Sequence, residues 1–190
     1  MKRTLILAAC TTILFACGDN KKDETKTSEN SMTSAADSAA KEKKPQASEM
    51  ADAKYVDMGK KMSSQFTSGD IDGWTSNFAD KSKFYWSSGD SLVGKAAIGG
   101  YWKNRRSSVI DSISFSNEIW LPWKINTPQA GPDMPGVWLL SWHMVNVKYK
   151  NGKRLQFWVH EDYHFDASDK VDQAVEYIDR APINKALGMK

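Results

Sequence analysis

The sequence predicts an α+β fold in which helices near the amino terminus precede an antiparallel sheet. Three observations support this prediction. Apolar residues recur every three or four positions between Tyr55 and Phe66, which is the spacing of one helix face. Beyond Val109, apolar and polar residues alternate, which is the period of a strand. Asn151-Gly152 then separates two long apolar-rich segments, and this dipeptide is a strong hairpin signal.

Three helices are expected ahead of the sheet. The first ends at residues 68–70, where Gly69 stops it and Asp70 can cap a second, short helix. The third follows Gly94, after a short extended segment at residues 83–86. The apolar residues expected to pack inward are Tyr55, Met58, Met62 and Phe66 in the first helix, Ile71, Trp74 and Phe78 in the second, and Ile98, Tyr101 and Trp102 in the third.

Four strands are expected after the helices, each pairing with the next. The first includes residues 119–125, where Pro122 indicates an edge position or a bulge. Residues 126–136 form a Pro/Gly-rich loop that is long enough to be a lid or a simple insertion. Two long strands follow, joined at residues 150–153, and a turn at residues 166–170 leads into the last strand, 171–179.

The amino terminus has the features of a secretory signal. Met1-Lys2-Arg3 is basic, and residues 4–16 carry no charge. Leu14-Phe15-Ala16-Cys17 resembles the lipobox of bacterial lipoproteins, which implies a signal peptide at residues 1–16 and a lipid attached to Cys17. The apolar run before Cys10 is short for a signal, and the whole run is too short for a transmembrane helix. An ordinary cleaved signal is the simpler alternative.

Residues 17–50 are expected to form a flexible tether between the lipid and the folded domain. They contain many charged and small polar residues, so they cannot bury enough apolar surface to offset the entropy of ordering. Gly18 follows Cys17 where an aspartate would signal retention in the inner membrane. We therefore expect a lipid-anchored protein of the bacterial cell envelope, in the outer membrane, facing the periplasm or the cell surface.

Composition argues against several kinds of chemistry. The two cysteines, Cys10 and Cys17, both lie in the signal, so the mature protein would have no disulfide, no Cys-ligated metal and no catalytic thiol. The net charge is +3 and the basic residues are scattered, which argues against a nucleic-acid partner. Neither a phosphate-binding loop nor an HExxH motif is present, so no cofactor is expected.

Several short motifs resemble the nuclear transport factor 2-like superfamily, which includes SnoaL-like cyclases and ketosteroid isomerases. They are Gly69-Asp70-Ile71-Asp72-Gly73-Trp74, Phe78-Ala79-Asp80, Gly94-Lys95-Ala96-Ala97-Ile98, Tyr163-His164-Phe165-Asp166 and Lys170-Val171. The resemblance implies one domain, residues 51–187, with a cone-shaped curved sheet wrapped around the helices and an apolar pocket inside. Dimers are common in this superfamily, so a homodimer through the outer sheet face is an expected assembly.

The hairpin predicts which residues share a face. If Asn151-Gly152 forms a two-residue loop, Lys150 pairs with Lys153 and every later pair follows from that register. Glu161 then lies opposite Trp142, on a face that is expected to meet the helices or line the pocket. The pocket residues expected on this basis are Trp138, Leu140, Trp142, Met144, Val159, Glu161 and Tyr163, and the resemblance adds Trp86 on the far wall.

Glu161 is the one carboxylate on that face and the candidate catalytic residue. A carboxyl group among Trp and Tyr side chains loses hydration, which raises its pKa, and the neutral acid can donate a hydrogen bond to an oxyanion. The resemblance places Glu161 where ketosteroid isomerases carry such a donor. It also places Trp86 at the general-base position and Met62 near the tyrosine position, so that particular chemistry is not expected. The alternative is a structural acid, paired with Arg, Lys or Tyr, or a residue at the rim.

All three histidines fall on the opposite face in this register, with His143 directly across from His160. Cross-strand side chains lie ~5 Å apart, so the two could share a metal ion with Asp162 nearby. No fourth ligand is evident, and an exposed or dimer-facing polar patch is the more ordinary interpretation.

Two classes of function remain. The first, favoured because no acid–base pair is visible, is a tethered domain that binds a small apolar or amphipathic ligand, or a protein partner, without catalysis. The second is a lyase, isomerase or hydrolase that uses Glu161 as an acid or hydrogen-bond donor. A second pocket carboxylate would favour the enzyme. The last strand could supply one, because one register turns Glu176 inward and the other turns in Asp179.

Overall fold

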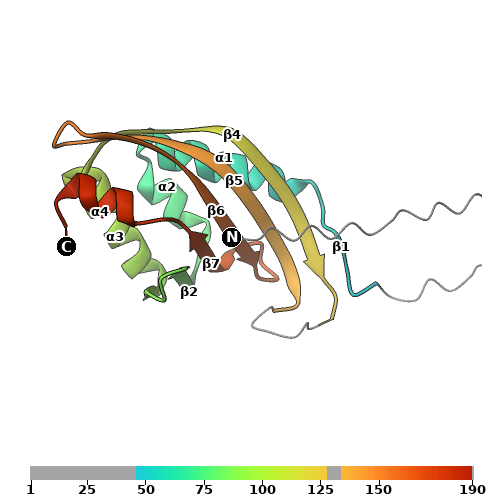
Figure 1. The fold of residues 1–190 in the computed structure, drawn as a ribbon. Helices are drawn as coiled ribbons and strands as arrows, with labels where there is room; N and C mark the ends of the chain where they lie inside the picture. Colours follow the sequence, from blue (N-terminus) through green and yellow to red (C-terminus); the bar gives the residue numbers. More distant parts are fainter. Residues whose placement is uncertain (1–45, 128–133, 190) are drawn as a thin grey trace, which may run out of the picture. The chain divides into compact units, whose positions relative to one another are not determined.

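A strongly curved sheet encloses the helices in the computed structural model (Figure 1). The structure describes residues 46–127 and 134–189; the predicted signal peptide, Cys17, most of the tether and the centre of the 126–136 loop lie outside them. In the described residues the elements are β1 (Ser48–Met50), α1 (Lys54–Ser68), α2 (Ile71–Ser76), β2 (Phe78–Trp86), β3 (Ser91–Val93), α3 (Lys95–Ser108), β4 (Ile110–Ile125), β5 (Gly136–Tyr149), β6 (Arg154–Phe165), β7 (Val171–Tyr177) and α4 (Ala181–Leu187).

The three helices that the sequence predicts are present, with one change. In α1, Tyr55, Met62 and Phe66 are buried, and Gly69 ends the helix at a φ of 88°. Asp70 caps α2, because its side chain accepts a hydrogen bond from the backbone of Gly73. The predicted second helix was too long, however, since α2 ends at Ser76 and Phe78 begins a strand. The Asn77 side chain donates to the last carbonyl groups of α2 and so satisfies its carboxyl end.

The described strands form one sheet, in the order β1-β4-β5-β6-β7-β2-β3. The predicted antiparallel meander is confirmed for β4 to β7. The sheet is mixed rather than wholly antiparallel, because β2 lies parallel to β7. Ser48–Met50, which the sequence assigns to the tether, form β1 and pair with the end of β4. The α+β class with a curved sheet around amino-terminal helices is therefore confirmed.

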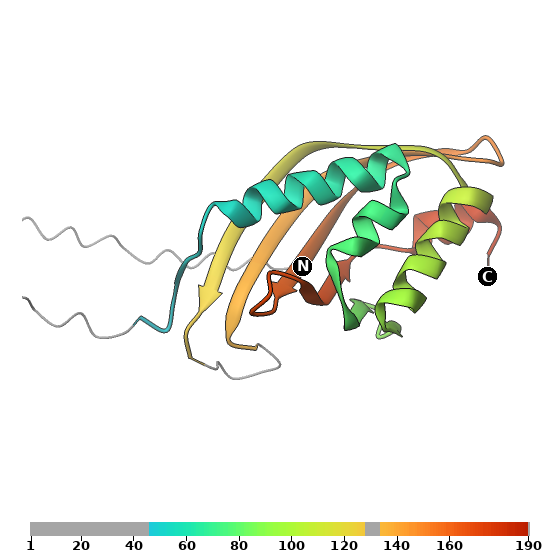
Figure 2. The same cartoon turned by 180° about the vertical axis from the view of Figure 1, so that it is seen from behind.

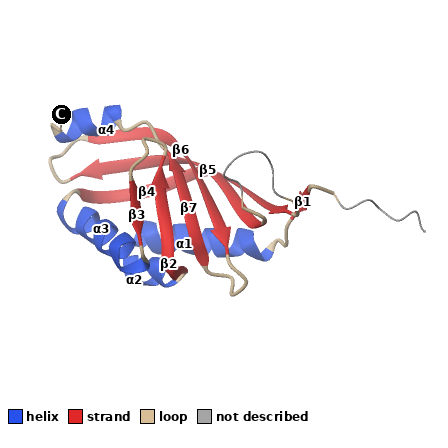
Figure 3. Ribbon diagram, turned by 90° about the horizontal axis from the view of Figure 1, so that it is seen from below, coloured by secondary structure: helices blue, strands red, loops and turns tan. Residues whose placement is uncertain are grey.

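The helices cover the concave side of the sheet. Figure 2 shows α1 lying across β4 and β5, and Figure 3 shows α1, α2 and α3 together beside the strands. The short helix α4, which sequence patterns did not predict, lies at the end of the sheet opposite β1. Pro182 lies in its first turn and Gly188 ends it at a φ of 70°. Asn151 of the β5–β6 turn donates a hydrogen bond to the Ala186 carbonyl of α4.

The turn between β5 and β6 has a different geometry from the predicted one. Gly152 has a φ of 84°, whereas Asn151 does not have the positive φ that a two-residue type I′ turn requires. Tyr149 instead donates a backbone hydrogen bond to Lys153, and Gly152 donates to Tyr149, which closes a three-residue loop. The predicted register was consequently wrong by one residue: Ser141 pairs with Glu161, and Trp142 pairs with His160.

The outer face of the sheet carries exposed apolar side chains. Ile119, Trp158 and Tyr177 are each about half exposed there, at 56%, 50% and 48%. Pairing of two copies through this face stays a prediction. In the described part of the chain, no helix is both long and apolar enough to span a bilayer.

Candidate functional site

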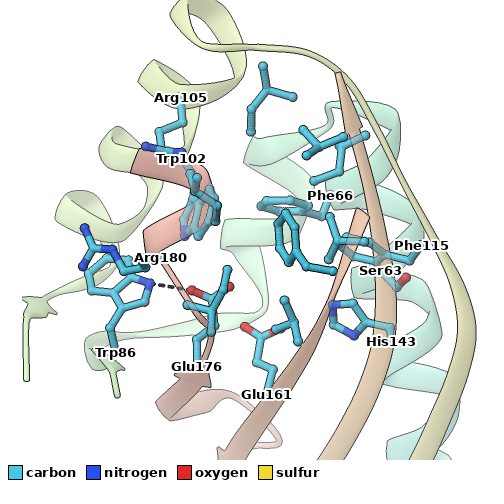
Figure 4. A pocket seen from close by; sticks show the side chains of 18 of the residues that line it. Ser63, Phe66, Trp86, Trp102, Arg105, Phe115, His143, Glu161, Glu176 and Arg180 are labelled. Atoms are coloured by element: carbon cyan, nitrogen blue, oxygen red, sulfur yellow. Dashed lines mark hydrogen bonds between the residues drawn. The ribbon is translucent and has the colours of Figure 1, made fainter. Parts of the chain in front are cut away.

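A pocket lies inside the cone, between the concave sheet face and the helices α1, α3 and α4 (Figure 4). Its walls are mainly aromatic and aliphatic side chains, and its cavity volume is about 100 Å³. That volume holds several waters or a small organic group. A concave, mostly apolar pocket with a few polar groups is the usual form of a small-molecule site.

The one-residue register shift divides the predicted pocket residues into two groups. Four of them line the pocket: Trp86, Val159, Glu161 and Tyr163. The other four, Trp138, Leu140, Trp142 and Met144, belong to the outer face of β5 and were placed wrongly. The reason is the period of two in a strand, since a shift of one residue exchanges the two faces of β5. Their neighbours His143, Val145 and Val147 point inward instead.

Two glutamates face each other inside the pocket. Glu161 on β6 and Glu176 on β7 are direct cross-strand partners, and both line the cavity. The Nε1 group of Trp86 donates a hydrogen bond of 2.5 Å to Glu176 Oε2, as Figure 4 shows. Glu176 is the inward residue of the last strand, with Ala174 fully buried beside it, so the structure selects one of the two registers that the sequence left open.

Both carboxyl groups hold their proton more tightly than an exposed glutamate does. Burial, and then the neighbouring Glu176, raise the pKa of Glu161 to about 8, while the Tyr163 hydroxyl acts in the opposite direction. Burial also raises the pKa of Glu176 to about 7, against the Trp86 hydrogen bond and the positive charges of Arg105 and Arg180. Two carboxyl groups so close cannot readily ionise together, so near neutral pH the pair retains a proton.

His143 is the third titratable group in this part of the pocket. It lies opposite the bulge of β4, its side chain is buried, and its ring centre is 4.2 Å from that of Phe115. Burial, and then His160, lower the pKa of His143 to about 4, so the ring is neutral at physiological pH. In the described residues its Nδ1 atom has no hydrogen-bond partner.

The expected arrangement of His143 beside His160 is wrong. His143 lies inside the cone and pairs with Val159, whereas His160 lies on the outer face. There the His160 ring stacks on Trp142 at 4.3 Å, and its Nε2 atom is 3.1 Å from Asp162. The two histidines therefore cannot share a metal ion. Within residues 46–127 and 134–189, no group of three or more His, Cys, Asp or Glu side chains is placed to hold one.

Sequence reasoning missed part of this site. Glu176 appeared only as one of two alternatives, and His143 was placed on the wrong face. Arg105 and Arg180, which also line the pocket, were not singled out. Arg105 lies one turn from Tyr101 and Trp102, which the sequence predicts to face inward. That spacing was a usable signal.

Comparison with known proteins adds evidence on the fold. No protein-family model matches the chain, and no curated protein matches it in sequence. Solved structures do match. A candidate isomerase from Bacillus subtilis is 13% identical, with a TM-score of 0.55 over 71% of this chain and 93% of its own. A candidate polyketide cyclase from Xanthomonas campestris pv. campestris is 11% identical, with a TM-score of 0.55 over 70% of this chain and 95% of its own.

A third similar structure is described by its fold alone. It is an NTF2-like protein of unknown function from Burkholderia pseudomallei K96243, 10% identical, with a TM-score of 0.54 over 69% of this chain and 95% of its own. Identities this low establish architecture and not activity. The part of this chain that the structure describes has the nuclear transport factor 2-like fold, in the form shared with SnoaL-like and ketosteroid isomerase-like proteins.

Proposed function

We propose that the pocket catalyses proton transfer on a small, mainly apolar substrate that carries a carbonyl or hydroxyl group. The observation that carries this proposal is the cross-strand pair Glu161–Glu176, enclosed in an apolar cavity. The sequence alone favoured binding without catalysis, because it showed one certain pocket carboxylate. A second carboxylate changes that balance, since proton transfer needs both an acid and a base.

The protonation behaviour of the pair suits this role. General acid–base catalysis is most efficient when the pKa of the catalytic group lies near the working pH. The pKa values of about 8 for Glu161 and about 7 for Glu176 meet this condition. When the pair holds one proton, one carboxyl group can donate to the substrate oxygen while the other removes a proton from carbon. Neutral His143 can add a hydrogen bond to the substrate.

The experiment follows exchange of carbon-bound protons adjacent to a carbonyl. A panel of cyclic and aryl ketones is incubated with the protein in D₂O, and deuterium uptake is followed by NMR. We expect exchange above the buffer rate, and a decrease of roughly 100-fold or more in Glu161→Gln and Glu176→Gln. Glu118→Gln is the matched control, because Glu118 is exposed and outside the pocket. Exchange that is equal in all four proteins would contradict the proposal.

A second candidate function is ligand binding without chemistry, which the largely apolar lining favours. In that case ketones from the panel quench tryptophan fluorescence on binding, because Trp74, Trp86, Trp102 and Trp120 line the pocket. Binding without deuterium uptake identifies this second function and excludes the first for the panel used.

We also propose that the protein is anchored through Cys17 to a bacterial membrane. The support is the Leu14-Phe15-Ala16-Cys17 sequence after an uncharged segment that follows a basic start. Cells fed a clickable fatty acid should label the wild-type protein and not the Cys17→Ser variant. An unlabelled wild-type protein would show that the segment is an ordinary cleaved signal.

A further inference from the structure

Two arginines line the pocket, and they differ in their partners. Arg180 is engaged by the protein itself: its Nη1 atom is 2.5 Å from Asp90 Oδ2, and its guanidinium lies 5.7 Å from the centre of the Trp86 ring. Arg105 on α3 is half-buried, and in the described residues its side chain has no ion pair. Its Cζ atom lies 5.7 Å from the centre of the Tyr101 ring.

The charge of Arg105 acts inside the pocket and not only at the surface. It lowers the pKa of Glu176 on β7 and opposes the rise that burial causes in the pKa of Tyr149 on β5. The charge therefore interacts with residues on two strands that line the cavity. In the described residues no ion pair joins Arg105 to Glu176, whose Oε2 atom accepts its hydrogen bond from Trp86 instead. A partly desolvated guanidinium without an anionic partner is costly, so it favours an anion supplied from outside.

We propose that Arg105 binds an acidic group of the ligand, so that the pocket takes amphipathic carboxylates in preference to neutral molecules of the same shape. The inference rests on the proposed function only for the position of the reacting group, which would lie at Glu161 and Glu176. A guanidinium is suited to this role because its planar fork donates two parallel hydrogen bonds to a carboxylate.

The rest of the cavity suits an apolar ligand body. Much of its lining is hydrocarbon: Ile110 and Val147 come from the sheet, and Ile183 and Leu187 come from α4. The combination of one unpaired cation, a proton-holding carboxyl pair and hydrocarbon walls fits a monoanion with an aryl or alkyl chain. A dianion or a sugar would leave charges or hydroxyl groups unpaired against these walls.

The test compares two ligands that differ only in charge. The dissociation constants of 4-phenylbutyrate and 4-phenylbutyramide are measured at pH 7.5 by tryptophan quenching. We expect the acid to bind wild-type protein at least tenfold more tightly than the amide. Arg105→Gln should abolish that difference by weakening acid binding far more than amide binding, and Arg105→Lys should retain part of it. Lys103→Gln is the control, since it removes the same charge from an exposed position of α3.

The outcomes separate this inference from the proposed function. Equal binding of acid and amide by wild-type protein would overturn the inference, as would an Arg105→Gln variant that loses both ligands equally. Deuterium exchange of neutral ketones that requires Glu161 would in those cases leave the proposed function standing. Conversely, a preference for the acid that depends on Arg105, with no exchange of any ketone, would support the inference and contradict catalysis.

Discussion

Glu161 on β6 lies directly across from Glu176 on β7, and both carboxyl groups face the same apolar pocket. Like charges directly opposite each other destabilise a sheet unless one of them is neutral. Here burial supplies the neutral form by raising both pKa values. The strand pairing that would destabilise the sheet therefore also creates a group that can exchange protons near neutral pH.

The stability of the protein should fall as the pH rises through this pair. The pKa of Glu161 is about 8 in the folded protein and near 4.5 in the unfolded chain, so its contribution is fully present below pH 4.5 and is lost through pH 8. We expect the melting temperature of the wild-type protein to decrease between pH 6.5 and 9. Glu161→Gln should show a shallower decrease, and Glu118→Gln should follow the wild type. If the melting temperatures of all three proteins changed equally with pH, Glu161 would already be ionised in the folded protein at pH 6.5.

His143 should have the opposite effect at acid pH. Its pKa is about 4 in the folded protein and near 6.5 in the unfolded chain, so its contribution is present above pH 6.5 and lost as the pH falls through 4. This difference corresponds to roughly 3 kcal/mol at most. Between pH 7 and 4.5, His143→Gln should lose less stability in urea melts than the wild type does. Equal losses of stability in the two proteins would contradict a buried, neutral His143.

Close packing at Gly59 should make this position intolerant of a methyl group. A Cβ atom there would lie 2.5 Å from Leu139 Cδ2 and 2.6 Å from Trp120 Cζ3. We expect Gly59→Ala to destabilise the protein by ~1–3 kcal/mol, because α1 would have to move away from the sheet. Gly100→Ala on α3 has no atom within 4 Å of the new Cβ and should stabilise by about 0.5–1 kcal/mol. Equal effects in chemical denaturation would contradict this packing.

The register of the central hairpin can be tested by cross-linking. The backbone bond from Tyr149 to Lys153 makes that pair hydrogen-bonded, so the pair Trp142–His160 is of the closer, non-hydrogen-bonded kind. Replacing both residues of this pair with cysteine should give a disulfide after mild oxidation, visible as a mass loss of two hydrogens. Cysteines at His143 and His160 should stay reduced, because these positions face opposite sides of the sheet. A disulfide that forms only between cysteines at positions 143 and 160 would show that the hairpin has the two-residue turn and its register.

The sequence by itself determined the elements that depend on local chemistry. The apolar spacing of Tyr55, Met62 and Phe66 predicts a helix with one buried face. Glycine is typical of a helix end and aspartate of a helix start, so Gly69 and Asp70 predict the boundary between the first two helices. The alternating segments after Val109 require strands, and Asn151-Gly152 requires a reversal between two of them. These signals act over a few residues, so they need no knowledge of the remaining chain.

The tertiary structure decided everything that depends on register and on contacts distant in sequence. One additional residue in the 150–152 loop moved Trp142 outward and His143 inward, and no local pattern distinguishes the two turns, since both accept Asn-Gly. The pairing of β7 with β6 turned Glu176 toward Glu161, 15 residues away. The parallel pairing of β2 with β7 brought Trp86 to Glu176 across 90 residues. The pocket assembles from these long-range pairings, because burial and neighbouring charge, which set the chemistry of each carboxyl group, exist only once the strands are side by side.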